Sequence, residues 1–369
     1  MRPTVLRKNS RFRIDFRTTL HIFAQDKSIS PMKTTLSTIA ENSGFSKSTV
    51  SRVLNGTADS SRISQDTINK IKKAAEECGY TPNLIAKNLR TNKTHTIGLL
   101  VPSISNPYFA DITSVIISEA RRLGYTTIVT DTMEDEKVQN TSISTLLSRR
   151  VDGIIIVPCG NDPTFLEQTN NRYIPIILVD RYYENSKLPY VVTNNYQGAY
   201  NATNLLIRNG HSDIVCIQGP PNTTPNKRRI DGYMHALRDS GIEDRAQIVG
   251  NDFSIQNGYL ETKLLLNNHE RPTAIFALSN TIGLGAIKAI REAQLSIPDD
   301  MSLISFDNNI YLDYFVPSIT RIGQMVDEMG KMAVKLLHDS ISNKRAVKSQ
   351  IELSPEMVMR DSVRPLIQQ

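Results

Sequence analysis

Apolar residues near the front of the chain recur at the spacing of short amphipathic helices. Leu36, Ile39 and Ala40 fall at positions i, i+3 and i+4, which places them on one face of a helix. Gly44 can end that helix in a left-handed conformation, and Ser46 is a suitable N-cap for the next one. The pattern therefore predicts two short helices joined by a tight turn.

The second helix has an apolar face of Val50, Val53 and Leu54, and a third helix is predicted between the cap Ser64 and the stop at Gly79. Two short helices braced by a third form the helix-turn-helix arrangement. The outward positions of the second helix are small or basic: Lys47, Ser48, Ser51 and Arg52. Because a recognition helix must approach base edges closely, this face favours DNA binding. A three-helix module that binds a protein is the alternative.

A short helix is also predicted within residues 80–93, starting near Pro82. An isolated helix of about two turns is marginal in water, so it should fold only when something docks against it. Leu89, between Lys87 and Arg90, suits an apolar wedge in a DNA minor groove. The alternative is an ordinary exposed leucine in a linker.

From residue 95 onward, short apolar runs alternate with helical patterns. The predicted strands are Ile97–Val101, Thr126–Thr130, Ile154–Val157, Ile176–Val179, Ile214–Ile217, Gln247–Val249, Ala274–Leu278 and Ser302–Phe306. The predicted helices are Ala110–Leu123, Val138–Arg149, Asn195–Asn209, Arg228–Ser240, Ile255–Leu266 and Ile282–Ala293. This alternation predicts parallel sheets covered on both faces. Roughly 270 residues are too many for one sheet, so we expect two similar lobes.

Ligands of open α/β sheets bind beyond the carboxyl ends of the strands, so the residues that follow the strands are candidates for a binding site. Aromatic rings beside amides could cover the apolar faces of a sugar or a base there. The candidates are Asn106, Tyr108, Phe109, Asp131, Arg229, Phe253, Ser279 and Asp307. Asp180 and Arg181 also follow a predicted strand. For any one of these residues, a loop or capping role is the alternative.

The charge is distributed unevenly along the chain. Residues 1–93 contain 17 Lys and Arg against 7 Asp and Glu, whereas residues 94–369 contain 26 against 30. A basic front end on a mildly acidic body indicates that the front end meets a polyanion. A basic tail that only aids solubility would give the same balance.

Several protein classes are disfavoured by the sequence. The longest apolar runs fall short of the ~20 residues of a membrane helix, and the basic first residues do not form a secretion signal. Cys78, Cys159 and Cys216 are far apart, which fits a reducing cytoplasm better than disulfides or a zinc site. The scattered histidines and the missing H-E-x-x-H and G-x-S-x-G motifs favour a protein that is not an enzyme and needs no metal or cofactor.

The stretches T-L-S-T-I-A-E-N-S-G-F-S-K-S-T-V-S-R-V-L-N-G, Y-T-P-N-L-I-A-K-N-L-R and H-T-I-G-L-L-V-P start at positions 35, 80 and 95. In these motifs the chain resembles the LacI/GalR family of bacterial transcription regulators, and the resemblance covers all but about the first 31 residues. It implies an all-α helix-turn-helix headpiece with a hinge helix. A two-lobed α/β domain of the periplasmic-binding-protein type, with parallel sheets, should follow.

The resemblance also implies roles for individual residues of the headpiece. The DNA-binding residues would be Ser46, Lys47, Ser48, Thr49, Ser51, Arg52, Asn55, Ala86, Leu89 and Arg90. Among these, Lys47, Ser48 and Arg52 would read bases, and Leu89 would be the hinge leucine inserted at the operator centre. Arginine is suited to bidentate hydrogen bonding with guanine. Lys47 could read guanine or hold a phosphate.

In the second domain, Arg229 and Asp307 match family positions that contact a small effector, and the chain departs from the family pattern nearby. Ser279 and Asn280 stand where many relatives have Asn-Asp, and Ser305 replaces a glycine. The chemistry suits a sugar, a sugar acid or a sugar phosphate through charge-assisted hydrogen bonds. The family also includes a purine responder, so a base stays open as the effector.

The predicted domains are a basic extension over 1–31, a headpiece over 32–79, a hinge over 80–93 and an effector and dimerisation domain over 94–369. Lobe 1 should span about 94–193 and 324–352, and lobe 2 about 196–322 and 354–369. The extension contains seven basic and two acidic residues. We expect it to be disordered or a misassigned start before Met32; its rival is a real basic arm that contacts phosphates.

These observations predict a cytoplasmic transcriptional regulator, more precisely a repressor. It should bind a pseudo-palindromic operator as a homodimer under the control of a small sugar-like effector held between two lobes. The alternative is a sugar-binding or sensor protein whose headpiece binds a protein partner.

Overall fold

The computed structural model describes residues 34–55, 63–80, 93–343 and 348–366. The chain divides into two compact units, one ending at Asn92 and the other beginning at Lys93. The extension predicted over 1–31 and nearly all of the hinge predicted over 80–93 lie outside the described residues, so neither prediction is tested here.

In the described part of the first unit, three helices pack around a small apolar core. They are α2 (Leu36–Ser43), α3 (Lys47–Leu54) and α4 (Gln65–Glu77). Ile39, Val50 and Ile71, one from each helix, are completely buried in that core. The helix-turn-helix predicted from the apolar spacing is therefore confirmed.

Hydroxyl side chains define where these helices begin. Thr35, Ser46 and Ser64 each accept a hydrogen bond from the backbone N–H three residues further on. Gly44 has φ +74°, a left-handed conformation that ends α2. The turn between α2 and α3 is thus fixed locally, and it sets the direction in which α3 leaves α2.

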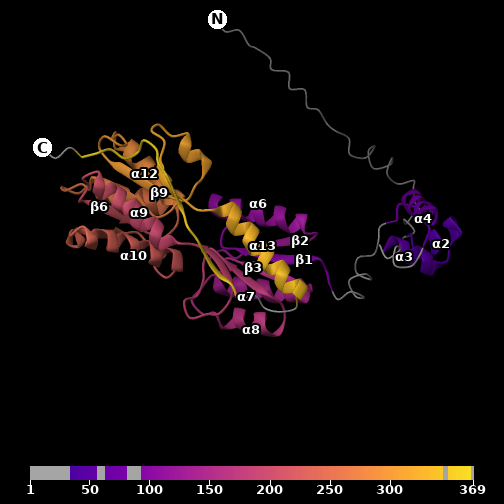
Figure 1. Cartoon of the computed structure of the whole chain (residues 1–369). Helices are drawn as coiled ribbons and strands as arrows, with labels where there is room; N and C mark the ends of the chain where they lie inside the picture. Colours follow the sequence, from indigo (N-terminus) through magenta and orange to yellow (C-terminus); the bar gives the residue numbers. More distant parts are fainter. Residues whose placement is uncertain (1–33, 56–62, 81–92, 344–347, 367–369) are drawn as a thin grey trace, which may run out of the picture. The chain divides into compact units, whose positions relative to one another are not determined.

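The second unit contains two sheets, each with six strands among the described residues (Figure 1). The first sheet is entirely parallel, in the order β11-β5-β4-β3-β1-β2. Its strands are β1 (Thr96–Val101), β2 (Thr126–Asp131), β3 (Gly153–Ile156), β4 (Ile176–Val179), β5 (Tyr190–Thr193) and β11 (Gln350–Leu353). The central strands β3 and β4 are apolar on both faces because helices cover both sides of the sheet.

The second sheet has the corresponding order β12-β10-β9-β8-β6-β7 and is parallel except for the pair β10–β12. Its strands are β6 (Ile214–Ile217), β7 (Gln247–Val249), β8 (Ala274–Ala277), β9 (Ser302–Phe306), β10 (Thr320–Gly323) and β12 (Glu356–Val358). Two α/β lobes with parallel sheets were predicted from the alternation, and this fold class is confirmed.

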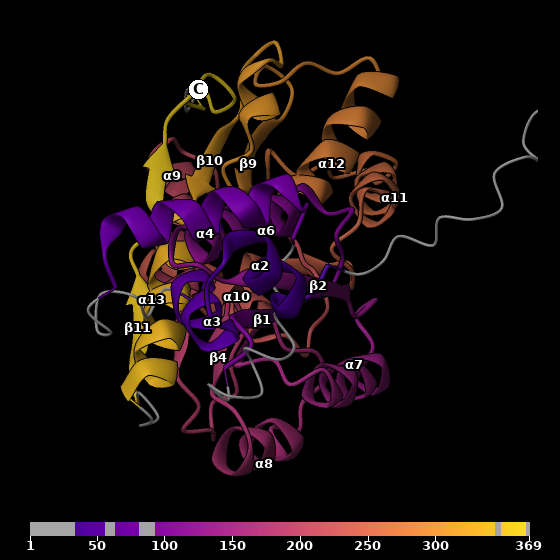
Figure 2. The ribbon, with the colours of Figure 1, turned by 90° about the vertical axis from the view of Figure 1, so that its right-hand side faces the viewer.

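Each sheet has helices on both faces. In lobe 1 (residues 93–193 and 326–353) they are α6 (Pro107–Arg122) and α13 (Val326–Asn343) on one face and α7 (Glu136–Ser148) and α8 (Thr164–Arg172) on the other. In lobe 2 (residues 195–323 and 356–366) they are α9 (Asn195–Arg208) and α10 (Thr224–Asp239) on one face and α11 (Ile255–Leu266) and α12 (Asn280–Glu292) on the other. Lobe 2 also contains the short 3-10 helices η2 (Glu243–Arg245) and η3 (Ile310–Asp313). Helix α11 lies along α12 (Figure 2).

The described chain crosses between the lobes after β5, after β10 and between β11 and β12. Four strands (β5, β10, β11 and β12) and the helices α8 and α13 were not predicted. The strands β11 and β12 are short edge strands without a fully buried residue, so their sequences lack a buried apolar run.

A salt bridge fastens the C-terminal segment of lobe 2. Asp313 accepts hydrogen bonds from Arg321 at 2.9 Å and from Arg360 at 2.7 Å. These two guanidinium groups lower the pKa of Asp313 to about 2. Because Arg321 is buried, it depends on this carboxylate for its countercharge.

We expect Asp313→Asn to lower the Tm of the second unit by about 2–5 °C at pH 7. The pKa of Asp313 is lower in the folded chain than in the unfolded chain. The stabilisation is therefore complete above about pH 4 and is lost as the pH falls towards 2. Thermal unfolding of the wild type and of Asp313→Asn at pH 7 and pH 3 tests this. The difference between their Tm values should be smaller at pH 3 than at pH 7. A difference independent of pH would contradict the electrostatic origin.

Candidate functional site

Helix α3 presents one polar face to solvent. Lys47, Ser48 and Arg52 are exposed on it, whereas Val50 and Val53 are buried on the opposite side. Lys47 and Ser48 lie in the first turn and Arg52 in the last turn. The exposed face therefore has a basic side chain near each end and a short hydroxyl side chain at its start. This surface can donate hydrogen bonds and supply positive charge to a ligand.

Other predicted DNA-binding residues make local hydrogen bonds. The Ser46 hydroxyl lies 2.9 Å from that of Ser48 and 2.8 Å from that of Thr49, and it caps α3. At the other end, the Asn55 amide donates to the Ser51 carbonyl at 2.7 Å and so closes the helix. These contacts hold the helix ends in place. The predicted residues Ala86, Leu89 and Arg90 lie outside the described residues.

In the second unit, a cavity of about 30 Å³ lies where the two lobes meet. Its lining is Asn106, Tyr108, Phe109, Asp180, Arg181, Pro225, Arg229, Phe253, Ser279, Asp307 and Gln324. All but one of the candidates predicted from strand ends are thus brought together from distant parts of the sequence. We call this space the inner cavity.

Asp131 is the predicted residue that does not line the inner cavity. Its carboxylate accepts hydrogen bonds from the backbone N–H groups of Ile104 and Met133, each at 2.9 Å. Asp131 therefore joins the two loops that follow β1 and β2. The capping alternative describes its contacts better than a ligand contact does.

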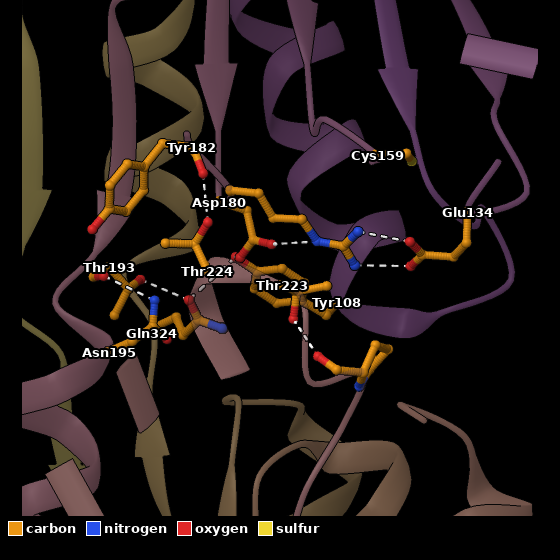
Figure 3. A network of polar contacts seen from close by, with 12 residues as sticks. Tyr108, Glu134, Cys159, Asp180, Tyr182, Thr193, Asn195, Thr223, Thr224 and Gln324 are labelled. Atoms are coloured by element: carbon orange, nitrogen blue, oxygen red, sulfur yellow. Dashed lines mark hydrogen bonds and ion pairs between the residues drawn. The ribbon is translucent and has the colours of Figure 1, made fainter. Parts of the chain in front are cut away.

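A chain of hydrogen bonds runs along the inner cavity from one lobe to the other. Figure 3 shows its members Tyr108, Asp180, Thr193 and Gln324. The Tyr108 hydroxyl lies 2.7 Å from Asp180 in lobe 1 and 3.2 Å from the amide oxygen of Gln324. The Gln324 amide nitrogen donates to Asp307 of lobe 2 at 2.7 Å, and its oxygen accepts from Thr193 at 2.6 Å. Because Gln324 follows β10 at a crossing point, this chain connects the inner cavity to one of the segments that join the lobes.

Burial shifts the pKa values of two members of this hydrogen-bond chain, Tyr108 and Asp180. Loss of solvent, followed by the nearby Asp180 charge, raises the pKa of Tyr108 well above its usual value. Burial also raises the pKa of Asp180, although the Arg181 cation opposes that change. At neutral pH, Tyr108 is therefore a hydrogen-bond donor that keeps its proton.

Arg229 is fixed in place before any ligand arrives. Its guanidinium donates to Asn195 at 2.8 Å and to the Leu278 carbonyl at 2.5 Å, and its central carbon lies 3.6 Å from the centre of the Phe306 ring. A Cβ at Gly232 would lie 2.3 Å from a backbone oxygen of α9, so glycine lets α10 approach α9 closely and brings Arg229 to Asn195. Burial lowers the pKa of Arg229, with Asp307 and Asp180 opposing. Its remaining donor capacity is available to a ligand in the cavity.

Asp307 occupies a special backbone position at the end of β9. It has φ +74°, in the left-handed region, and its carboxylate accepts the backbone N–H of Asn280 at 3.1 Å. Asn280 in turn contacts Asn309 through its side-chain amide. The Ser305 hydroxyl, which stands where the family pattern has glycine, donates to the Ser279 carbonyl at 3.2 Å. The departures from the family pattern are therefore accommodated by local hydrogen bonds.

A larger outer chamber of about 500 Å³ is lined by the loops after β2, β3 and β4 and by the start of α10. Arg181 lines both this chamber and the inner cavity. The carboxylates along the two linings are Glu134, Asp180, Glu184, Asp252 and Asp307. The cations are Arg181, Lys227 and Arg229. Acidic side chains therefore exceed basic ones around the cleft.

Several lining residues were not predicted as site residues. Asp180 and Arg181 directly follow the predicted strand that became β4, and the strand-end rule singled them out without placing them among the residues predicted to contact the effector. Gln324 and Pro225 have no such signal. Gln324 follows β10, which was not predicted, and its position at a crossing is visible only in three dimensions.

Comparison with known proteins gives two matches that together span most of the chain. Residues 35–83 match the family described as "Bacterial regulatory proteins, lacI family", and residues 94–356 match "Periplasmic binding proteins and sugar binding domain of LacI family". The chain belongs to the LacI family. It is a transcriptional regulator with a helix-turn-helix DNA-binding domain and an effector-binding domain, and not an enzyme. The resemblance inferred from the motifs is confirmed.

Individual relatives agree with this assignment. The HTH-type transcriptional regulator DegA of Bacillus subtilis is 35% identical over 91% of this chain and 99% of its own length. The lac repressor dimer, solved bound to operator and the anti-inducer ONPF, has a TM-score of 0.81 at 26% identity and covers 90% of this chain and 99% of its own. A LacI-family regulator from Enterococcus faecium with bound ribose has a TM-score of 0.68 at 30% identity, over 73% of this LacI-family chain and 99% of its own.

Within the described part of this LacI-family chain, no helix is long and apolar enough to cross a membrane.

Proposed function

We propose that this LacI-family regulator is a repressor that binds a pseudo-palindromic operator as a homodimer in the bacterial cytoplasm. The exposed face of α3, with Lys47, Ser48 and Arg52, is the observation that carries the proposal. A helix held by its neighbours with such a face fits the DNA major groove. The lac repressor, a relative in fold and sequence, was solved as a dimer on its operator.

Exposed apolar side chains on lobe 2 support dimerisation. Ile255, Leu260 and Leu264 on α11 are exposed, as are Ile310 of η3 and Tyr314 just after it. Large exposed apolar side chains gathered on a few elements favour a protein contact. A second copy of the chain is the partner expected from the two-fold symmetry of an operator.

The effector, we infer, is a small sugar-like molecule held between the lobes. Arg229 and Asp307 supply a buried donor and a buried acceptor, and Tyr108, Phe109 and Phe253 supply aromatic surfaces. This combination suits a ring that has hydroxyl groups on its edges and apolar faces. The ribose bound by the Enterococcus faecium relative supports the same class of ligand.

Ligand and DNA are coupled in this proposal through the connection between the lobes. The inner cavity of about 30 Å³ holds no more than about one water molecule, so a sugar that enters between the lobes has to widen it and change the contacts of Gln324. The relative stability of the open and closed lobes changes with those contacts. The segment 80–93 then folds as a hinge helix on DNA in one of these states only. By linkage, the effector alters DNA affinity by the same factor as DNA alters effector affinity.

Selection of bound sequences from a random DNA duplex pool tests the DNA-binding proposal. The purified full chain should enrich a palindrome with a flexible central step. The selection is repeated with a bacterial metabolite extract, since a co-repressor could be required. Failure to enrich any sequence under either condition would contradict sequence-specific DNA binding.

We expect Leu89→Ala to weaken operator binding by roughly tenfold and to reduce DNA bending, because the apolar wedge of the hinge is lost. Fluorescence anisotropy and gel mobility of circularly permuted operator fragments measure the two effects. Affinity for non-specific DNA should not change, since it depends on phosphate contacts. Unchanged operator affinity and bending would refute the wedge.

A further inference from the structure

Arg181, which lines both the inner cavity and the outer chamber, forms a bidentate ion pair with Glu134 of the outer chamber. The two terminal nitrogens of the Arg181 guanidinium donate to the two carboxylate oxygens of Glu134, at 2.6 and 2.8 Å. Arg181 is 4% exposed, and its Nε lies 3.8 Å from Asp180. Glu134, by contrast, is about half exposed at the wall of the outer chamber. Among the described lining residues, Arg181 is the only buried cation that lines both spaces. It is therefore already paired with an acidic side chain of the protein itself.

The backbone holds Glu134 in this position. Met133 and Glu134 both have positive φ, +54° and +56°, which is uncommon for residues with side chains. The Asp131 carboxylate accepts the Met133 N–H, and the Glu134 N–H donates to the Pro102 carbonyl at 3.1 Å. Such a conformation persists only where the surroundings fix it. The turn after β2 thus presents Glu134 to Arg181 and does not leave it to rotate freely in solvent.

Arg181 would be the natural partner of an anionic ligand. Its planar fork matches a carboxylate or a phosphate in two-point geometry, and it lies between the two spaces that a ligand could fill. A sugar acid or sugar phosphate would have to displace Glu134 from this fork, or lie beside Glu134 and Asp180 with like charge. The remaining cations do not offer the same site: Arg229 keeps some donor capacity but faces the carboxylates Asp307 and Asp180, and Lys227 is exposed to water.

We infer that Glu134 is a specificity-determining residue that restricts the cleft to uncharged sugars and excludes sugar acids and sugar phosphates. This inference rests on the proposed sugar-like effector. Among neutral sugars, sugar acids and sugar phosphates, it selects the neutral sugars. Neutral hydroxyl groups can donate to the surplus carboxylates and accept from the arginines without breaking the Glu134–Arg181 pair. An added negative charge would meet no buried cation of the cleft without a carboxylate already near it, because Arg181 faces Glu134 and Arg229 faces Asp307 and Asp180.

The test compares matched neutral and anionic sugars on the full-length protein. Isothermal titration calorimetry is run with ribose, ribose 5-phosphate, glucose, glucose 6-phosphate and glucuronate. The variants are Glu134→Gln, which keeps a hydrogen-bond acceptor at Arg181 but removes the charge, and the control Glu184→Gln. Glu184 lines the same chamber but pairs with Arg228 at 3.0 Å, away from Arg181.

In the wild type, a neutral sugar should bind more tightly than its anionic counterpart. In Glu134→Gln, the affinity ratio of anionic to neutral sugar should rise by roughly tenfold, and in Glu184→Gln by less than about threefold, because that pair is exposed and screened by salt. A rise of equal size in both variants would show a general field effect and would overturn the specific role of Glu134.

Two further outcomes separate this inference from the proposed function. Anionic sugars that bind the wild type as tightly as neutral ones would overturn the inference and leave the sugar-like effector standing. If no sugar of either charge binds the wild type or the variants, the sugar-like effector is wrong, and the inference fails with it.

Discussion

We expect Asp307→Asn to abolish the response of operator binding to the effector, while operator affinity without effector should stay within about twofold of the wild type. The carboxylate lies at the end of β9 and accepts hydrogen bonds from Gln324 and from the Asn280 backbone. In our proposal it is the acceptor in lobe 2 that joins a bound sugar to the crossing segment. Asparagine keeps the shape and tolerates the left-handed backbone of Asp307, so the fold should persist. Asp307→Ala should abolish the response as well.

The measurement is fluorescence anisotropy of an operator fragment with and without the sugar that binds the wild type in calorimetry. Asp313→Asn is the matched control, because it removes a carboxylate from the same lobe at a salt bridge outside the cleft. That control should keep the full response. An Asp307→Asn protein that still responds would move the effector site elsewhere.

The interior of the fold could be predicted from the sequence because burial leaves a local signature. Strands such as β3 and β4 are continuous apolar runs, and the caps Ser46 and Ser64 occur next to the helices that they start. The edge strands β11 and β12 have no such signature, because their stability comes from pairing with segments far away in the sequence. Pairing between distant segments leaves no periodic pattern in a single sequence.

The cleft was predictable to the extent that it follows strand ends. That rule placed Arg229 and Asp307 beside one cavity, although it also selected Asp131, which caps two loops instead. It could not find Gln324, whose role arises from a crossing between lobes. The partnership of Glu134 with Arg181 joins loops 47 residues apart and is likewise a property of the folded chain alone.

We expect Arg52→Ala to relax the preference at one base pair in each operator half-site, at a cost of roughly 1–3 kcal/mol per half-site for the preferred base. Arg52 is exposed in the last turn of α3, and a guanidinium can form two parallel hydrogen bonds with guanine. Alanine keeps the helix but removes both bonds, so the wild-type site loses affinity while sites changed at that base pair lose little. Anisotropy titrations over all single-base variants of the selected operator measure this pattern.

Lys70→Ala provides the control for charge alone. Lys70 lies on α4 and pairs with Asp66, so its removal takes one cation from the same unit without altering the exposed face of α3. At equal ionic strength, any loss it causes should be the same for every operator variant, because phosphate attraction is independent of sequence. If Arg52→Ala shows that same uniform loss, the residue holds a phosphate, and base reading by α3 then rests on Lys47 and Ser48.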